Sequence, residues 1–104
     1  MFMEIAEIKK ACEEFRLAGY RMEKMARKAY ERLVSAGIPC ERPFFYRGLA
    51  EWINVGSGMI SIEERKGKKF EYFCISVDEK YTKPIKSVMK DLGIEEYIYS
   101  SAKK

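Results

Sequence analysis

The chain of 104 residues contains no histidine and no glutamine, and it has one asparagine, Asn54, and one threonine, Thr82. Without histidine, the commonest general base and the usual mixed zinc sites are missing. The sequence therefore argues against an enzyme, and we expect no catalytic residue, no metal and no cofactor. Scarce amides beside 14 Glu and 20 Lys plus Arg are typical of hyperthermophile proteins, so we expect a thermophilic, archaeal-like source.

Long apolar runs are also missing. No stretch of 18 apolar residues occurs, so we expect no membrane span. The first residues include Glu4 and Glu7, where a signal peptide needs an uninterrupted apolar stretch. These features predict a cytoplasmic protein.

Cysteine is scarce, with Cys12, Cys40 and Cys74 far apart and no CxxC motif. We interpret the three as small, buried apolar side chains. One disulfide is the alternative, because intracellular proteins of hyperthermophiles do contain them.

The first third of the sequence predicts one long helix over about residues 3–36. Apolar or small residues alternate at spacings of three and four, which is the pattern of a continuous helical seam. The seam consists of Ile5, Ile8, Cys12, Phe15, Gly19, Met22, Ala26, Ala29, Leu33 and Ala36. Gly37 and Pro39 end the helix. At 1.5 Å per residue the rod is roughly 50 Å long, which exceeds the width of a compact domain of this size.

Two arrangements accommodate so long a helix. It breaks near Gly19, or its overhanging part packs on a second copy of the protein and gives a homodimer. The small seam residues Gly19, Ala26 and Ala29 permit close approach of another helix, but they equally suit contact with the sheet of the same chain. Both interpretations stay open at this point.

The segment over about residues 44–78 predicts strands. FFYRGLAEWINV (44–55) reads as one irregular strand or two short ones. GSG (56–58) predicts a turn between strands rather than a phosphate loop, because a strand pattern follows it instead of a helix. MISIEER and KKFEYFCISV alternate around Lys66-Gly67, which predicts a hairpin with a two- or three-residue loop.

A second helix is predicted over about residues 83–92, with Thr82 as its cap and Pro84 in its first turn. Gly93 ends it, and a short strand follows over about 95–100. We therefore predict an α+β fold in a single domain, residues 1–104: a long N-terminal helix, a three-stranded, mainly antiparallel sheet, a second helix and a short C-terminal strand. The predicted core consists of Ile5, Ile8, Phe15, Met22, Leu33, Ile60, Ile62, Phe73, Ile75, Val77, Ile85, Val88, Met89 and Leu92.

This order of elements matches that of many metal-dependent nucleases, so the acidic residues are candidate ligands of a metal site. Asp78 ends the third predicted strand, but the hairpin register places no carboxylate opposite it. Glu63 and Glu64 fall roughly 20 Å away at about 3.3 Å per residue, which is too far for two shared metal ions. Glu51 is the remaining candidate, so a small hydrolase is the weakest interpretation.

The basic residues give the best functional signal. Net charge is +2 over residues 1–36, −1 over 37–79 and +3 over 80–104, which sums to +4. Flexible cationic side chains provide sequence-independent contacts to phosphates. The predicted nucleic-acid site combines a hairpin tip with one helix face: Arg65, Lys66, Lys68, Lys69, Lys80, Lys83, Lys86 and Lys90. A lysine-rich thermophile surface without this role is the plainer reading.

Aromatic residues gather in the predicted strands. If one sheet face is open, Tyr46, Tyr72 and Arg47 have the chemistry to stack on bases. A face covered by the long helix or a partner subunit is the stronger expectation.

These patterns predict a small binding module that contacts DNA or RNA mainly through phosphates. The alternative is a protein-interaction or assembly subunit that dimerises through the long helix, with a further protein partner that the sequence does not identify and no nucleic-acid role.

Overall fold

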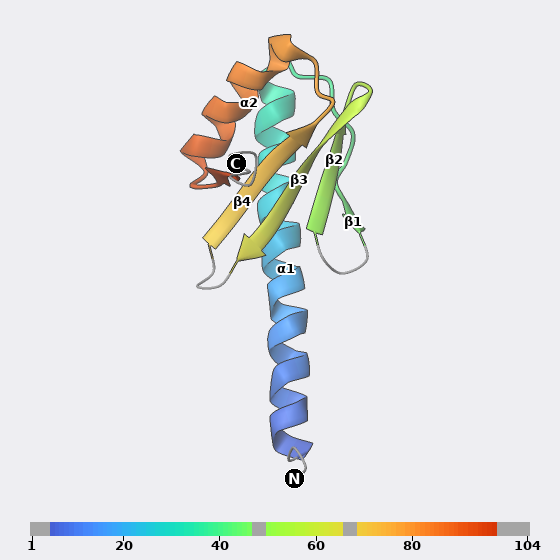
Figure 1. The fold of residues 1–104 in the computed structure, drawn as a ribbon, viewed down its shortest axis with the longest axis vertical. Helices are drawn as coiled ribbons and strands as arrows, with labels where there is room; N and C mark the ends of the chain where they lie inside the picture. The colour runs from blue at the N-terminus through green and yellow to red at the C-terminus, as the bar shows by residue number, and fades with distance from the viewer. Residues whose placement is uncertain (1–4, 47–49, 66–68, 98–104) are drawn as a thin grey trace, which may run out of the picture.

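The computed structural model describes residues 5–46, 50–65 and 69–97 of the chain. The elements in chain order are α1 (Ile5–Ser35), β1 (Phe44–Tyr46), β2 (Ala50–Val55), β3 (Gly58–Arg65), β4 (Lys69–Ile75), α2 (Glu79–Asp91) and β5 (Glu95–Glu96) (Figure 1). The predicted α+β class is therefore confirmed.

The strands of the described residues form one five-stranded sheet, in the order β1-β2-β3-β4-β5. Neighbours from β1 to β4 are antiparallel, whereas β5 pairs in parallel with β4 through Glu71 and Glu95. The predicted three-stranded sheet therefore differs from the observed one in part. Of the two readings of residues 44–55, the structure has the two short strands β1 and β2, and the C-terminal strand joins the same sheet. That strand was predicted to reach Ser100, but residues 98–100 lie outside the described part.

Short turns connect the strands as the sequence predicts. Gly56 and Ser57 join β2 to β3, and Val55 pairs directly with Gly58. Gly56 has φ of +60°, a conformation that glycine adopts without steric cost. A Cβ at Gly58 would lie 2.3 Å from the backbone oxygen of Ser76, so only glycine fits there. Arg65 pairs with Lys69 at the end of the β3–β4 hairpin, and the loop between them lies outside the described part.

Helix α1 is continuous through Gly19, and its two halves have different environments. The half that includes Met22, Ala26, Ala29 and Leu33 is buried. Figure 1 shows this half against the sheet, while the first half projects well beyond it. Three residues expected in the core are exposed on the projecting half, Ile5 by 72%, Ile8 by 46% and Phe15 by 65%, and Cys12 is exposed as well. The prediction that they are buried was wrong for the single chain, because the sheet ends before it reaches them.

Helix α2 starts earlier than the sequence predicted. Asp78 is the N-cap, and its carboxylate accepts a hydrogen bond from the Lys80 N–H at 3.2 Å. The prediction of Thr82 as cap was wrong, because its hydroxyl lies within the helix and donates to the Glu79 carbonyl at 2.8 Å. Pro84 likewise lies inside the helix rather than in its first turn. The predicted C-terminal end is confirmed. Gly93 has φ of +77°, and the Ile94 N–H donates to the Met89 carbonyl at 2.8 Å.

The core lies between one face of the sheet and both helices. Alternation along the strands directs Ile53, Ile60, Ile62 and Tyr72 to this face. The predicted core residues that are buried are Met22, Leu33, Ile60, Ile62, Ile85, Val88 and Met89. Three more, Phe73, Val77 and Leu92, are partly buried.

The opposite face of the sheet is covered by neither helix. Trp52, Phe73 and Ile75 alternate onto this face, which explains why Ile75 is exposed although it was predicted to be buried. Phe44 contacts Trp52 edge to face with ring centroids 6.0 Å apart, and Phe73 lies 6.0 Å from Tyr97. One face is thus a packed core, and the other is an aromatic surface within the described part of the chain.

Candidate functional site

The residues predicted to bind nucleic acid fall into two separate groups. Arg65 and Lys69 lie at the end of the β3–β4 hairpin, and four lysines lie on α2. Those four are Lys80, Lys83, Lys86 and Lys90, all of them exposed. The remaining two, Lys66 and Lys68, lie outside the described residues.

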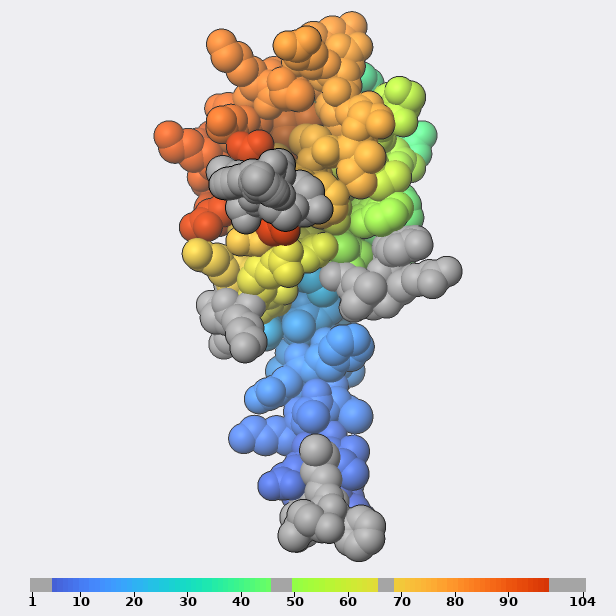
Figure 2. Space-filling view, viewed as in Figure 1, coloured from blue at the N-terminus to red at the C-terminus, as the bar shows by residue number. Residues whose placement is uncertain are grey.

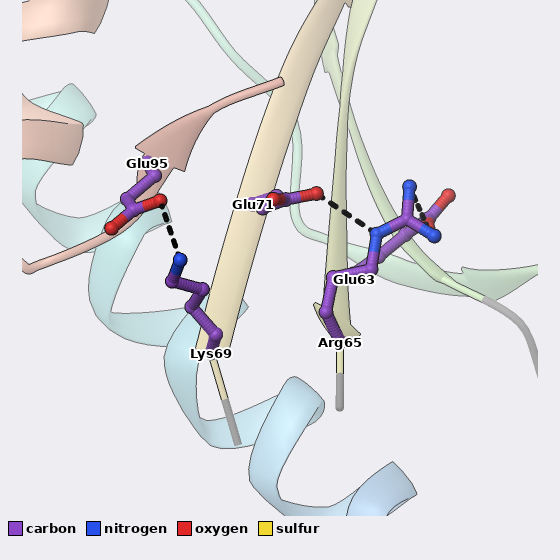
Figure 3. Close-up of polar contacts among 5 residues, drawn as sticks. All are labelled: Glu63, Arg65, Lys69, Glu71 and Glu95. Atoms are coloured by element: carbon purple, nitrogen blue, oxygen red, sulfur yellow. Dashed lines mark hydrogen bonds and ion pairs between the residues drawn. The ribbon is translucent and has the colours of Figure 1, made fainter. Parts of the chain in front are cut away.

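Arg65 is held by two carboxylates on its own hairpin (Figure 3). Its Nε lies 2.9 Å from Oε1 of Glu71, and a terminal nitrogen lies 3.3 Å from Oε1 of Glu63. The guanidinium also lies over the ring of Tyr97, 5.3 Å from its centroid. The hydrogen bond to Glu71 and the charge of Glu63 raise the pKa of Arg65 above its ordinary value. Arg65 is therefore a partner of its own strands before any ligand arrives.

Two carboxylates of β5 pair with lysines from both groups. Lys69 Nζ lies 3.3 Å from Oε1 of Glu95, as Figure 3 shows, and Lys86 Nζ lies 3.6 Å from Oε1 of Glu96. Because β5 contacts both β4 and α2, its two carboxylates lie between the hairpin group and the helix group. The predicted surface is thus divided by negative charge.

Three lysines of α2 form no ion pair with a described residue. Lys80 lies over the ring of Tyr81 at 5.3 Å. Lys83 and Lys90 form no ion pair within the described ranges. The structure therefore brings the predicted basic residues together only in part. The sequence signal that was missed is the pair Glu95-Glu96, which looked like the start of an ordinary strand.

Aromatic stacking through Tyr72 is not available. Tyr72 faces the helices and is buried, and burial raises the pKa of its hydroxyl to about 12. The side chain of Tyr46, and Arg47, lie outside the described part. The aromatic residues on the face away from the helices are Phe44, Trp52, Phe73 and Tyr97, and sequence alternation alone did not indicate which face would be open.

The cysteines are free thiols rather than a disulfide. Burial raises the pKa of Cys74 to about 11 and also raises the pKa of Cys40. Thiolates are the nucleophilic form, so neither side chain is suited to nucleophilic chemistry at neutral pH. Cys12 is exposed on the projecting half of α1.

The projecting half of α1, residues Ile5–Ala18, has a row of apolar side chains that are exposed to solvent. Figure 2 shows it as a separate column that leaves the body of the molecule. Its apolar residues continue the seam that is buried under the sheet from Met22 onward. Solvent-exposed apolar side chains in a continuous row mark a contact surface.

A groove lies between α1 and the edge strand β1, with a cavity volume of about 880 Å³. We call it the α1–β1 groove. Its lining combines aromatic rings with charged side chains and consists of Phe15, Arg16, Gly19, Tyr20, Glu23, Arg27, Tyr30, Glu31, Arg42, Pro43, Phe44, Phe45 and Glu51. Phe45 extends from β1 to α1, since a Cβ at Gly19 would lie 3.6 Å from its ring.

Glu51 is the buried acid of this groove. It lies on β2, pairs with Phe45 of β1 and is only 4% exposed. Burial raises the pKa of its carboxyl group; the charge of Glu23 adds to the effect, and the charge of Arg27 opposes it. Arg27 contacts Glu23 at 3.2 Å and makes no ion pair with Glu51. From the sequence, Glu51 was a candidate only for the acidic site of a small hydrolase.

No group of three or more metal-binding side chains occurs in the described ranges. Within the same ranges, no helix has the length and apolar character that crossing a membrane requires. No protein-family model, curated protein or solved structure matches this chain. The features that bear on function are therefore the basic residues, the projecting half of α1 and the α1–β1 groove.

Proposed function

We propose that this protein is an assembly or protein-interaction module that dimerises through the projecting half of α1. The observation that supports the proposal is the continuous seam. From Met22 the seam is buried by the chain's own sheet, whereas Ile5, Ile8, Cys12 and Phe15 extend the same stripe into solvent. Burial of one Phe or Ile side chain contributes about 1.5–3 kcal/mol, so leaving this row exposed forfeits a substantial stabilisation.

A second copy of the chain suits this surface. Over Ile5–Ala18 three acidic residues (Glu7, Glu13 and Glu14) balance three basic ones (Lys9, Lys10 and Arg16), so the segment is neutral. A neutral helix meets its own copy without net repulsion, and it has no preference for a polyanion.

The sheet also restricts how two copies can meet. It covers the seam side of α1 from Met22 onward, so two parallel helices in register would bring both sheets into the same space. Two antiparallel helices overlap only along Ile5–Ala18 and leave the bodies at opposite ends. We therefore propose an antiparallel dimer, with each projecting half covering the other.

The test is sedimentation equilibrium at micromolar concentration. We expect a dimer for the unaltered protein. Phe15→Glu should weaken it by about 3 kcal/mol or more, because each copy loses a buried aromatic side chain worth about 1.5–3 kcal/mol. Leu17→Glu is the matched control, since Leu17 is also exposed and lies two residues away, on the far side of the helix. A monomeric wild type, or equal effects of both substitutions, would contradict the proposal.

Nucleic-acid binding is a second candidate, and exposed lysines on α2 favour it. Lys83 and Lys90 form no ion pair in the described part. Lys86 has one long ion pair, in which its Nζ lies 3.6 Å from Oε1 of Glu96. Replacing the three with Gln should lower the slope of log affinity against log salt by roughly 2.7 for duplex DNA. Replacing Lys10, Lys24 and Lys28 of α1 with Gln is the charge-matched control. No binding to DNA or RNA at low salt would exclude this role.

We also retain, as predictions, a cytoplasmic location and the thermophilic, archaeal-like source that the composition indicates.

A further inference from the structure

We propose that the α1–β1 groove is a binding site for an organic cation, an alkylammonium group that pairs with Glu51 while its carbon chain lies against aromatic rings. The groove borders the dimer seam, because Phe15 and Gly19 belong to both.

Glu51 is the acidic group that would pair with the cation. Glu51 is only 4% exposed, and no described residue forms a hydrogen bond or ion pair with its carboxylate. The described part contains no buried side-chain oxygen that lacks a partner, so the carboxylate oxygens are open to the groove. The nearest charged groups are Glu23 and Arg27 of α1, and these two contact each other at 3.2 Å. The surrounding side chains remove part of the hydration of this carboxylate, and a cation placed beside it in the groove offsets that loss.

Aromatic rings line the α1–β1 groove. Phe45 is 49% exposed although it is aromatic, and Tyr30 lies deeper on α1. Arg16 of the same groove lies over the ring of Tyr20, 5.9 Å from its centroid, so a cation already uses one of these rings. The faces of aromatic rings attract ammonium and guanidinium groups within about 6 Å, and this attraction is the basis of aromatic cages for alkylated ammonium ions. The rings also provide apolar area for the methylene groups that carry such a charge.

The size and position of the groove agree with this ligand class. Its volume of about 880 Å³ lies within the range of small-molecule sites. One side of the groove is β1, the edge strand of the sheet. An edge strand has backbone groups free to pair with an extended peptide. The alkylammonium group can therefore belong to a free polyamine or to a lysine side chain of a peptide that lies along β1.

Titration by NMR, followed through the backbone amides of Tyr30, Phe45 and Glu51, tests the proposal. The probes are spermidine, Nα-acetyl-lysine methylamide and a seven-residue peptide with one central lysine. We expect saturable shifts at these amides and weaker binding by about tenfold or more in Glu51→Gln, because a charge-assisted contact is lost. Glu51→Gln keeps the shape of the side chain and removes a buried charge, so it should fold.

Two controls separate the site from general charge attraction. Glu79→Gln removes an exposed acid of α2, away from the groove, and should change affinity less than about twofold. The peptide with norleucine in place of lysine should not bind. Tighter binding of the lysine peptide than of spermidine assigns the cation to a protein partner, and the reverse assigns it to a free amine.

Three results would overturn the proposal. The first is the absence of saturable shifts with any of the probes. The second is equal affinity in Glu51→Gln and the unaltered protein. The third is a groove whose amides shift with protein concentration alone, which would show that a second copy occupies it. The comparison of Glu51→Gln with the unaltered protein leaves Phe15 of the seam unchanged, so it tests the groove separately from the dimer.

Discussion

The guanidinium of Arg21 contacts both carboxylate oxygens of Glu64, with Nε 3.1 Å from each oxygen and a terminal nitrogen 3.0 Å from Oε2. The Glu64 side chain is 7% exposed and the Arg21 side chain 36%. Arg21 directly precedes Met22, the first buried residue of α1. This ion pair therefore joins α1 to β3 at the point where the helix leaves the sheet.

Arg21→Ala should destabilise the fold by about 2 kcal/mol, because it leaves a nearly buried carboxylate without its partner. Arg27→Ala is the control. Arg27 pairs with Glu23 on the exposed side of the same helix, and such pairs contribute about 0.5 kcal/mol or less. Urea unfolding at one fixed protein concentration measures both, since dimerisation makes stability depend on concentration. Similar losses in the two variants would show that the Arg21–Glu64 contact is not structural.

Leu33→Ala should cost about 2–5 kcal/mol, because Leu33 is fully buried between α1 and the sheet. Leu92→Ala should cost less, since Leu92 packs on the core but is only partly buried. Leu17→Ala should change the unfolding free energy by no more than about 0.5 kcal/mol, because Leu17 is exposed. The same urea measurement ranks the three. A Leu92 variant as unstable as the Leu33 variant would mean that α2 docks more tightly than its burial indicates.

Local patterns in the sequence predicted the local structure well. The alternation of three and four from Ile5 to Leu33 predicted one long helix, although it left a break near Gly19 open, and the glycines at 56 and 58 predicted the turn between β2 and β3. Gly93 predicted the end of α2. Each of these features depends on neighbours within a few residues, so periodicity and turn chemistry are sufficient to find them.

Contacts between distant segments could not be predicted in the same way. The seam is uniform along α1, and only the position of the sheet decides that Met22 is buried and Phe15 is exposed. The β4 sequence is apolar on both faces, so alternation separated Tyr72 from Phe73 without indicating which faces the helices. The pairing of Lys69 with Glu95 likewise depends on β5 returning beside β4.

Glu51 should make stability depend on pH. Burial raises its pKa in the folded protein, so the folded state holds this proton more tightly than the unfolded chain does. Its contribution therefore favours folding at low pH, and stability declines as the pH rises through the window between the unfolded and folded pKa values. Glu51→Gln removes the buried charge, so it should raise the melting temperature at pH 7 and leave it nearly unchanged near pH 4. Calorimetry of both proteins at the two pH values measures the difference. An equal shift at both would show that ionisation of Glu51 carries no cost.

Cys12 should report on the dimer through its reactivity. At pH 8 a thiol with a pKa of about 11, as at Cys74, is thiolate in roughly one molecule in a thousand. Burial also raises the pKa of Cys40, so its reaction with the label should be slower as well. The fast phase of labelling with a chromogenic disulfide should therefore be one equivalent, from the exposed Cys12. Cys12 belongs to the apolar seam, so dimerisation covers it, and its labelling rate should fall as protein concentration rises through the dimer dissociation constant. Phe15→Glu should abolish this dependence and keep the fast rate at every concentration. A rate for Cys12 that is independent of concentration in a dimeric protein would place the interface on another surface.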